Sequence, residues 1–196
     1  KEKLHLSDDD IDQRNRMEMN GLFTWDLGKG EHSRILFKKD GIELAELIYN
    51  PKSTEHENKS VGIKDLVVPT VPQKPDIVLQ LTKSDLQEGM KLTYLFDAKY
   101  RIDGKDKNGV DVPPEDAINQ MHRYRDAIYY KDYQTDSLKK EVIGGYILFP
   151  GDGEPTDVAV SKFYRTIDKV NIGAFPLRPK DMHNRQLLEQ FIEELI

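Results

Sequence analysis

The chain of 196 residues contains no cysteine, which limits both its covalent cross-links and its metal chemistry. Without thiols it forms no disulfide, and it cannot build a thiolate zinc site of the zinc-finger kind. Oxygen ligands remain, and these suit hard cations.

Long apolar runs and an excess of positive charge are also missing. No window approaches the roughly 20 apolar residues that span a bilayer, and nothing resembles a cleavable signal peptide. We therefore expect a cytoplasmic protein with no membrane partner. The 29 Lys and Arg against 35 Asp and Glu give a net charge of -6, so any phosphate binding must be local. No Walker-type loop is present, so any nucleotide hydrolysis would belong to a partner.

The length fits one domain with a substantial core. We expect residues 1–40 to form an extension of a helix and a hairpin, and residues 41–196 to form the core. Ser7, followed by three acids, predicts a helix ending near Gly21, and Asp40-Gly41 predicts a hairpin turn. The remaining pattern predicts strands at 77–81, 92–102, 142–149 and 172–177, and helices at 115–130 and at the C-terminus. This order indicates an α/β fold with a mixed central sheet flanked by helices.

The strand expected at 92–102 carries two charges in an otherwise apolar run. Strand alternation places Asp97 and Lys99 on one face and Phe96, Ala98 and Tyr100 on the other. Burying either charge alone costs several kcal/mol, on the order of the penalty for an unpaired ion in a protein interior. The pair therefore needs a partner, an ion or a wet cleft.

The triplet Asp97-Ala98-Lys99, with Pro75-Asp76 upstream, resembles the signature of the PD-(D/E)xK, or restriction-endonuclease-like, nuclease superfamily. Two later segments, 120–128 and 144–151, strengthen the likeness to the nuclease domain of McrC-like restriction subunits. Gln120 and Tyr124 also resemble the QxxxY helix motif of RecB-like nucleases.

The resemblance implies a metal-dependent nuclease, an endonuclease that hydrolyses DNA in restriction or anti-phage defence beside an NTP-driven partner. A cation is needed because the phosphodiester is shielded by its own charge, and Mg²⁺ or Mn²⁺ suits carboxylates. The implied metal ligands are Asp76, Asp97 and the Ala98 carbonyl, with Lys99 orienting the attacking water. Gln120 and Tyr124 are then catalytic positioning residues, and His122, Arg123 and Arg125 are candidate phosphate contacts.

One acid of the family pattern has no clear counterpart. Many members supply a further glutamate from a helix before the first core strand. Glu18 lies on the expected N-terminal helix, whereas Glu43 and Glu46 lie on an expected strand. Because residue 1 is Lys, we expect a fragment, and sequence upstream of Lys1 is a further candidate source of this acid.

Plainer interpretations stay open for several of these residues. Asp97 and Lys99 also suit an exposed ion pair on an edge strand, and Asp76 suits a turn cap after Pro75. Gln120, Tyr124 and His122 fit ordinary solvated or packed helix positions. The competing function is an inactive nucleic-acid-binding or scaffold module on the same fold, favoured by the missing glutamate and the negative charge.

Overall fold

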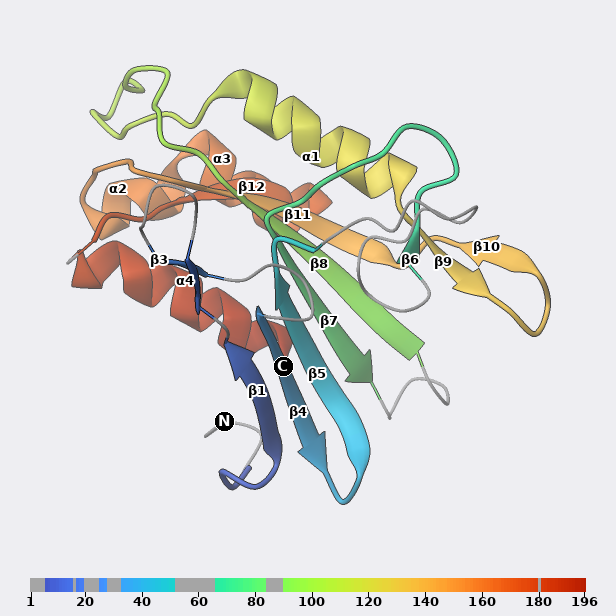
Figure 1. Cartoon of the computed structure of the whole chain (residues 1–196). Helices are drawn as coiled ribbons and strands as arrows, with labels where there is room; N and C mark the ends of the chain where they lie inside the picture. The colour runs from blue at the N-terminus through green and yellow to red at the C-terminus, as the bar shows by residue number, and fades with distance from the viewer. Residues whose placement is uncertain are drawn as a thin grey trace. The chain divides into compact units, whose positions relative to one another are not determined.

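The computed structural model describes residues 6–15, 17–19, 25–27, 33–51, 66–83, 90–179 and 181–196 (Figure 1). The largest sheet has seven strands in the order β1-β4-β5-β7-β8-β11-β12. Their bounds are β1 (Ile11–Asn15), β4 (Ser33–Lys39), β5 (Ile42–Tyr49), β7 (Ile77–Lys83), β8 (Met90–Ala98), β11 (Val142–Phe149) and β12 (Ile172–Pro176). Smaller sheets contain β2 (Met17–Met19), β3 (Trp25–Leu27), β6 (Leu66–Val67), β9 (Tyr129–Asp132) and β10 (Ser137–Lys139). The helices are α1 (Glu115–Ala127), α2 (Pro155–Val160), α3 (Lys162–Val170) and α4 (Met182–Leu195).

The pairing of the large sheet is mixed. β1, β4, β5 and β7 pair antiparallel in that order, whereas β11 and β12 pair parallel. The predicted α/β class, a mixed central sheet with flanking helices, is confirmed. Two compact units divide the chain: unit 1 is Lys1–Tyr94 with Ala127–Val142, and unit 2 is Leu95–Asp126 with Ile143–Ile196.

Unit 1 is built around the β4–β5 hairpin. Asp40 and Gly41 turn the chain with φ angles of 51° and 80°, the positive values that a two-residue hairpin turn needs. Lys39 faces Ile42 across this turn, so the predicted Asp40-Gly41 hairpin is confirmed. The core of the hairpin and of β7 is apolar and buried, and comprises Leu36, Ala45, Ile48, Val78, Leu79 and Leu81.

The helix predicted at the N-terminus is wrong, because β1 and β2 occupy this segment. Asp10 accepts hydrogen bonds from the backbone N–H and the hydroxyl of Ser7 (2.8 and 2.7 Å), so the cap closes a turn and not a helix. These bonds hold the pKa of the Asp10 carboxyl below its usual range. Ile11 then pairs with Phe37 of β4. The expected helix end, Gly21, lies outside the described residues.

In unit 2 the elements near the expected site follow the predictions closely but end earlier. β8 ends at Ala98, four residues before the predicted 102, and Tyr100 is 95% exposed, not on an apolar face. α1 ends at Ala127, three residues before the predicted 130, because β9 begins at Tyr129. Its predicted stripe of Ala117, Met121, Tyr124 and Ile128 is buried.

The rest of unit 2 packs around aromatic rings. The Tyr146 ring on β11 lies 5.2 Å from that of Phe96 and 4.8 Å from that of Phe191 on α4, centroid to centroid. The predicted strand at 172–177 is confirmed as β12, and the C-terminal helix as α4. On β12, a Cβ added to Gly173 would lie 2.3 Å from the carbonyl oxygen of Phe163, so glycine lets α3 pack closely on this strand.

Among the described residues, no helix is long and apolar enough to cross a membrane.

Candidate active site

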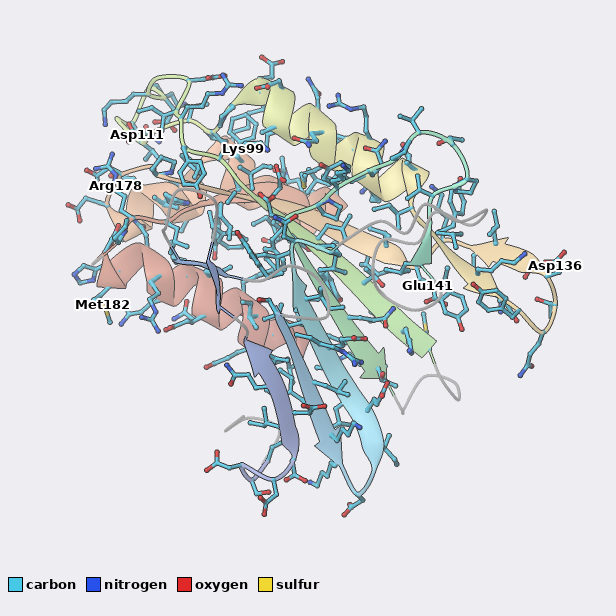
Figure 2. All side chains as sticks on the ribbon, viewed as in Figure 1. Lys99, Asp111, Asp136, Glu141, Arg178 and Met182 are labelled. Atoms are coloured by element: carbon cyan, nitrogen blue, oxygen red, sulfur yellow. The ribbon has the colours of Figure 1, made fainter. Side chains whose placement is uncertain are left out.

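The centre of the expected site lies where β8 ends. Asp97 is the penultimate residue of this strand, and its side chain is 3% exposed. Lys99 follows the strand, with its side chain 24% exposed, and its ammonium donates a hydrogen bond to Oδ2 of Asp97. The Lys99 backbone N–H donates to the carbonyl of Leu148 on β11 at 2.8 Å. This hydrogen bond holds the Lys99 backbone beside the neighbouring strand. Figure 2 labels Lys99 just beyond the end of β8.

This arrangement shows why the strand carries two charges. Burial of the Asp97 carboxylate removes water, so an adjacent cation is needed to compensate for the lost hydration. Lys99 supplies that cation while part of its side chain still reaches solvent. The exposed ion pair on an edge strand, the plainer alternative, is wrong for Asp97, because this carboxylate is buried.

Gln120 and Tyr124 lie one turn apart on α1 and contact each other. The Gln120 amide nitrogen donates a hydrogen bond to the Tyr124 hydroxyl. Tyr124 is 3% exposed and Gln120 is half-buried, so the pair lies at the boundary between core and solvent. The Gln120 amide and the Tyr124 hydroxyl therefore satisfy each other's hydrogen bonding, because residues i and i+4 lie on the same side of a helix. Their catalytic positioning role stays a prediction.

The three candidate phosphate contacts on α1 differ in their surroundings. His122 is exposed and lines a hollow of about 420 Å³ that Lys162 also lines. Arg123 is exposed. Arg125 donates from Nη1 to the carbonyl of Val170 at 2.7 Å, at the C-terminal end of α3, where a cation is favourable. Arg125 thus already joins two helices, and contacts of all three residues with phosphate stay predictions.

Asp76 belongs to unit 1 and precedes β7. It is half-buried, and its carbonyl accepts a hydrogen bond from the backbone N–H of Asn50. This contact anchors the start of β7 beside the end of β5, in keeping with their antiparallel pairing. That Asp76 shares a metal with Asp97 stays a prediction from the order of residues in the sequence.

The candidates for the further acid fall on strands. Glu18 lies on β2, so its expected position on a helix is wrong. Glu43 and Glu46 lie on β5, as predicted. Glu46 is 9% exposed and its Oε1 accepts from Nε of Arg34 at 2.5 Å, so this carboxylate is already paired. Glu43 is exposed.

The donor chemistry of Asp97 fits a hard cation. Its carboxylate is buried and is paired with the Lys99 ammonium. Hard cations such as Mg²⁺ prefer carboxylate oxygens as ligands. Within the ranges that the structure describes, however, no three His, Asp or Glu side chains gather in a metal-binding arrangement. A complete ligand set therefore needs donors beyond the immediate neighbours of Asp97.

The comparison with known families agrees with this geometry. A family model described as the PD-(D/E)XK nuclease superfamily matches residues 4–154. The chain belongs to this superfamily. The match includes Asp76, β8, α1 and β11, so the Asp97-Ala98-Lys99 triplet lies inside it. The restriction-endonuclease-like fold expected of the superfamily is the mixed sheet with flanking helices described above. No curated protein and no solved structure matches the chain.

The α3 helix was not expected from the sequence. As a result, the surface that carries Lys162, Arg165 and Lys169 was not identified from the sequence. A signal was present, because Tyr164 and Ile167 follow a helical spacing and Asn171 stands at the end, where its φ of 54° stops the helix.

Proposed function

We propose that the chain is a divalent-metal-dependent nuclease that hydrolyses DNA phosphodiester bonds at Asp97 and Lys99. The observation that carries the proposal is the buried Asp97 carboxylate bonded to Lys99 within the superfamily match. A carboxylate and an ammonium held at one strand end supply two functions that phosphodiester hydrolysis needs, a cation ligand and a positive group beside the phosphate.

The residues divide these roles. Asp97, the carbonyl of Ala98 and, from the sequence order, Asp76 would hold Mg²⁺ or Mn²⁺. When bound, such a cation lowers the pKa of a water ligand and offsets negative charge on the phosphate. Lys99 hydrogen-bonds and orients the attacking water and stabilises charge that develops on the phosphate oxygens. Gln120, through Tyr124, would position the substrate from α1.

The proposed role in restriction or anti-phage defence, with an NTP-driven partner, rests on the resemblance to McrC-like subunits alone. The net charge of -6 supports a partner, since bulk charge does not draw DNA to the chain. Co-expression of the chain with such a partner, followed by phage plating, would test this role. Equal plaque counts with wild type and Lys99→Ala would argue against it.

The test of the nuclease itself compares the wild type with Asp97→Asn and Lys99→Ala on linear and supercoiled DNA with Mg²⁺ or Mn²⁺. Lys91→Ala is the matched control, because it removes a lysine from the same strand seven residues before the end. We expect cleavage by the wild type and the control, and loss in both site variants. Cleavage that survives Lys99→Ala and Asp97→Asn would identify a contaminant or another centre.

A second candidate is an inactive DNA-binding module. The observation that favours it is that the described residues show no cluster of three metal-ligating side chains. In this case DNA binding would be unchanged by EDTA and by Asp97→Asn, and no metal would elicit cleavage.

A further inference from the structure

A basic surface lies on the side of α3 that faces away from the core. A hollow of about 390 Å³ is bounded by α3 and by the loop that follows β8. We name it the α3 groove and define it by Lys107, Asn108, Ser161, Lys162, Arg165 and Lys169. All six residues belong to unit 2.

Helical spacing gathers three of the cations on one side. Lys162, Arg165 and Lys169 are separated by three and four residues, so they lie above one another on α3. The buried residue of this helix, Ile167, points to the opposite side and packs in the core. Lys107 adds a fourth cation from the loop, and all four side chains are exposed.

The cations of the α3 groove outnumber the acidic side chains that line it. Within the described part of the chain, Lys107, Arg165 and Lys169 take part in none of the ion pairs between side chains. Asp106 also lines the hollow and contributes one negative charge against four positive ones, and its Oδ1 accepts the backbone N–H groups of Asn108 and Val110 at 2.8 and 3.0 Å. The groove therefore carries a local excess of positive charge on a chain whose net charge is -6.

We propose that the α3 groove binds the phosphate backbone of duplex DNA. The inference rests on the proposed function for the identity of the nucleic acid, and it adds the surface that holds it. The seven helical steps from Lys162 to Lys169 rise about 10 Å along the helix, which is the axial length of about three phosphates on one strand. Ser161 and Asn108 supply neutral donors of the kind that bind phosphate oxygens.

The lining favours a polyanion over a folded protein partner. It consists mainly of charged and polar side chains, whereas the centre of an interface with a folded protein is depleted in charged residues and enriched in aromatic anchors. α3 also lies beyond residues 4–154, so the cations that it carries are outside the region that the superfamily match covers.

The experiment measures binding without cleavage. A fluorescein-labelled 20-base-pair duplex is titrated with the chain in EDTA, by anisotropy, at several salt concentrations. The groove variant is Arg165→Gln/Lys169→Gln. Its matched control is Lys38→Gln/Lys39→Gln, which also removes two positive charges, but from β4.

We expect the groove variant to bind roughly 10- to 50-fold more weakly at 0.1 M salt, with a salt slope smaller by about 2, one for each lost phosphate contact. The control should bind nearly as the wild type does. Lys107→Gln, in an exposed loop, should weaken binding by a smaller factor and provides a test independent of the fold of α3. Circular dichroism melts would show whether each variant is folded.

Three results would each overturn the inference. The first is that the wild type does not bind the duplex. The second is that the groove variant binds as tightly as the control variant and Lys107→Gln binds as tightly as the wild type. The third is that the groove binds duplex RNA or polyglutamate more tightly than duplex DNA. The nuclease proposal fails separately. Groove-dependent DNA binding without cleavage in any metal would keep this inference and reject the nuclease, whereas cleavage with no groove effect would do the reverse.

Discussion

Arg178 donates a hydrogen bond from Nη2 to Oδ2 of Asp111 at 3.2 Å, across 67 residues of sequence. The Asp111 side chain is 2% exposed, and Nζ of Lys105 lies 2.9 Å from its other oxygen. Arg178 also donates to Oδ2 of Asp152 at 3.0 Å and to the carbonyl of Pro150 at 2.8 Å. Figure 2 shows Asp111 and Arg178 beside each other. One guanidinium thus ties together the loop after β8, the loop after β11 and the turn before α4.

We expect Arg178→Ala to lower the free energy of unfolding by about 1.5–3 kcal/mol, the range for hydrogen bonds to charged groups. The reason is that Asp111 stays buried while it loses one of its two cations. Urea denaturation followed by circular dichroism measures the change. Arg185→Ala is the matched control, since its 2.7 Å pair with Glu189 is exposed on α4 and should contribute less than about 0.5 kcal/mol. Equal effects of the two substitutions would contradict the prediction.

The Asp97–Lys99 pair predicts an asymmetry in stability. Lys99→Met leaves a nearly buried carboxylate without its ammonium, so we expect the free energy of unfolding to fall by about 1.5–3 kcal/mol. Asp97→Asn should cost less, because Lys99 can still turn toward solvent. Urea titrations of both variants in EDTA give the two values. If Mg²⁺ binds at Asp97, it should restore part of the stability of Lys99→Met and none in Asp97→Asn. If Asp97→Asn lowered the free energy of unfolding more than Lys99→Met, the prediction would be wrong, and the Lys99 ammonium would be the charge that depends more on its partner.

Gly173 predicts a packing effect at the contact of α3 with β12. An added Cβ would lie 2.3 Å from the Phe163 carbonyl oxygen and 2.4 Å from Cγ1 of Ile167, so Gly173→Ala must displace α3. We expect a loss of about 1–3 kcal/mol, as for overpacked cores, in chemical denaturation. Gly41→Asn is the control. It lies in an open hairpin turn with a φ of 80°, which Asn tolerates, and should change stability little. A neutral Gly173→Ala would mean that α3 shifts without cost.

The cap of α4 predicts a pH dependence. Asp181 accepts hydrogen bonds from the backbone N–H groups of His183 and Asn184 at 3.1 and 3.2 Å, and the bond from Asn184 is the main cause that lowers the pKa of this carboxyl. Because the folded-state pKa is depressed, the charged cap stabilises the fold at pH values above about 4 and loses this contribution as the pH falls through the folded-state pKa. Asp181→Ala should therefore cost about 1 kcal/mol at pH 7 and less at pH 2.5.

Asp181→Asn separates charge from capping in the same experiment. Asn keeps the side-chain acceptor but does not titrate, so its difference from Asp181→Ala should not change with pH. Thermal melts of the three proteins across this range measure both effects. A constant gap between wild type and Asp181→Ala would show that the carboxyl has no linkage to folding.

The sequence was most informative where local signals and burial agreed. Asp40-Gly41 carried the turn chemistry of a hairpin, and the stripe of α1 had a helical period with acids in its first turn, so both were predicted correctly. The continuous apolar run of β11 identified a buried strand for the same reason. In each case several weak preferences pointed to one structure.

The errors arose where tertiary contacts decided the structure. The N-terminal segment had a helix cap but only a weak apolar stripe, and pairing of Ile11 with Phe37 outweighed that local preference. The hairpin of β9 and β10 was missed because its strands are short and half-exposed, with little apolar alternation. For the site, sequence spacing alone indicated the Asp97–Lys99 pair, whereas the bond of Arg125 to Val170 depends on residues 45 apart and had no local signal.

Tyr100 is 95% exposed immediately after Lys99, and the chain has no cysteine. A Tyr100→Cys substitution would therefore create a single thiol in the whole protein, one residue from the proposed centre and accessible to reagents. A dye or spin label attached there would need no removal of other cysteines, and its signal would show whether DNA comes close to the end of β8.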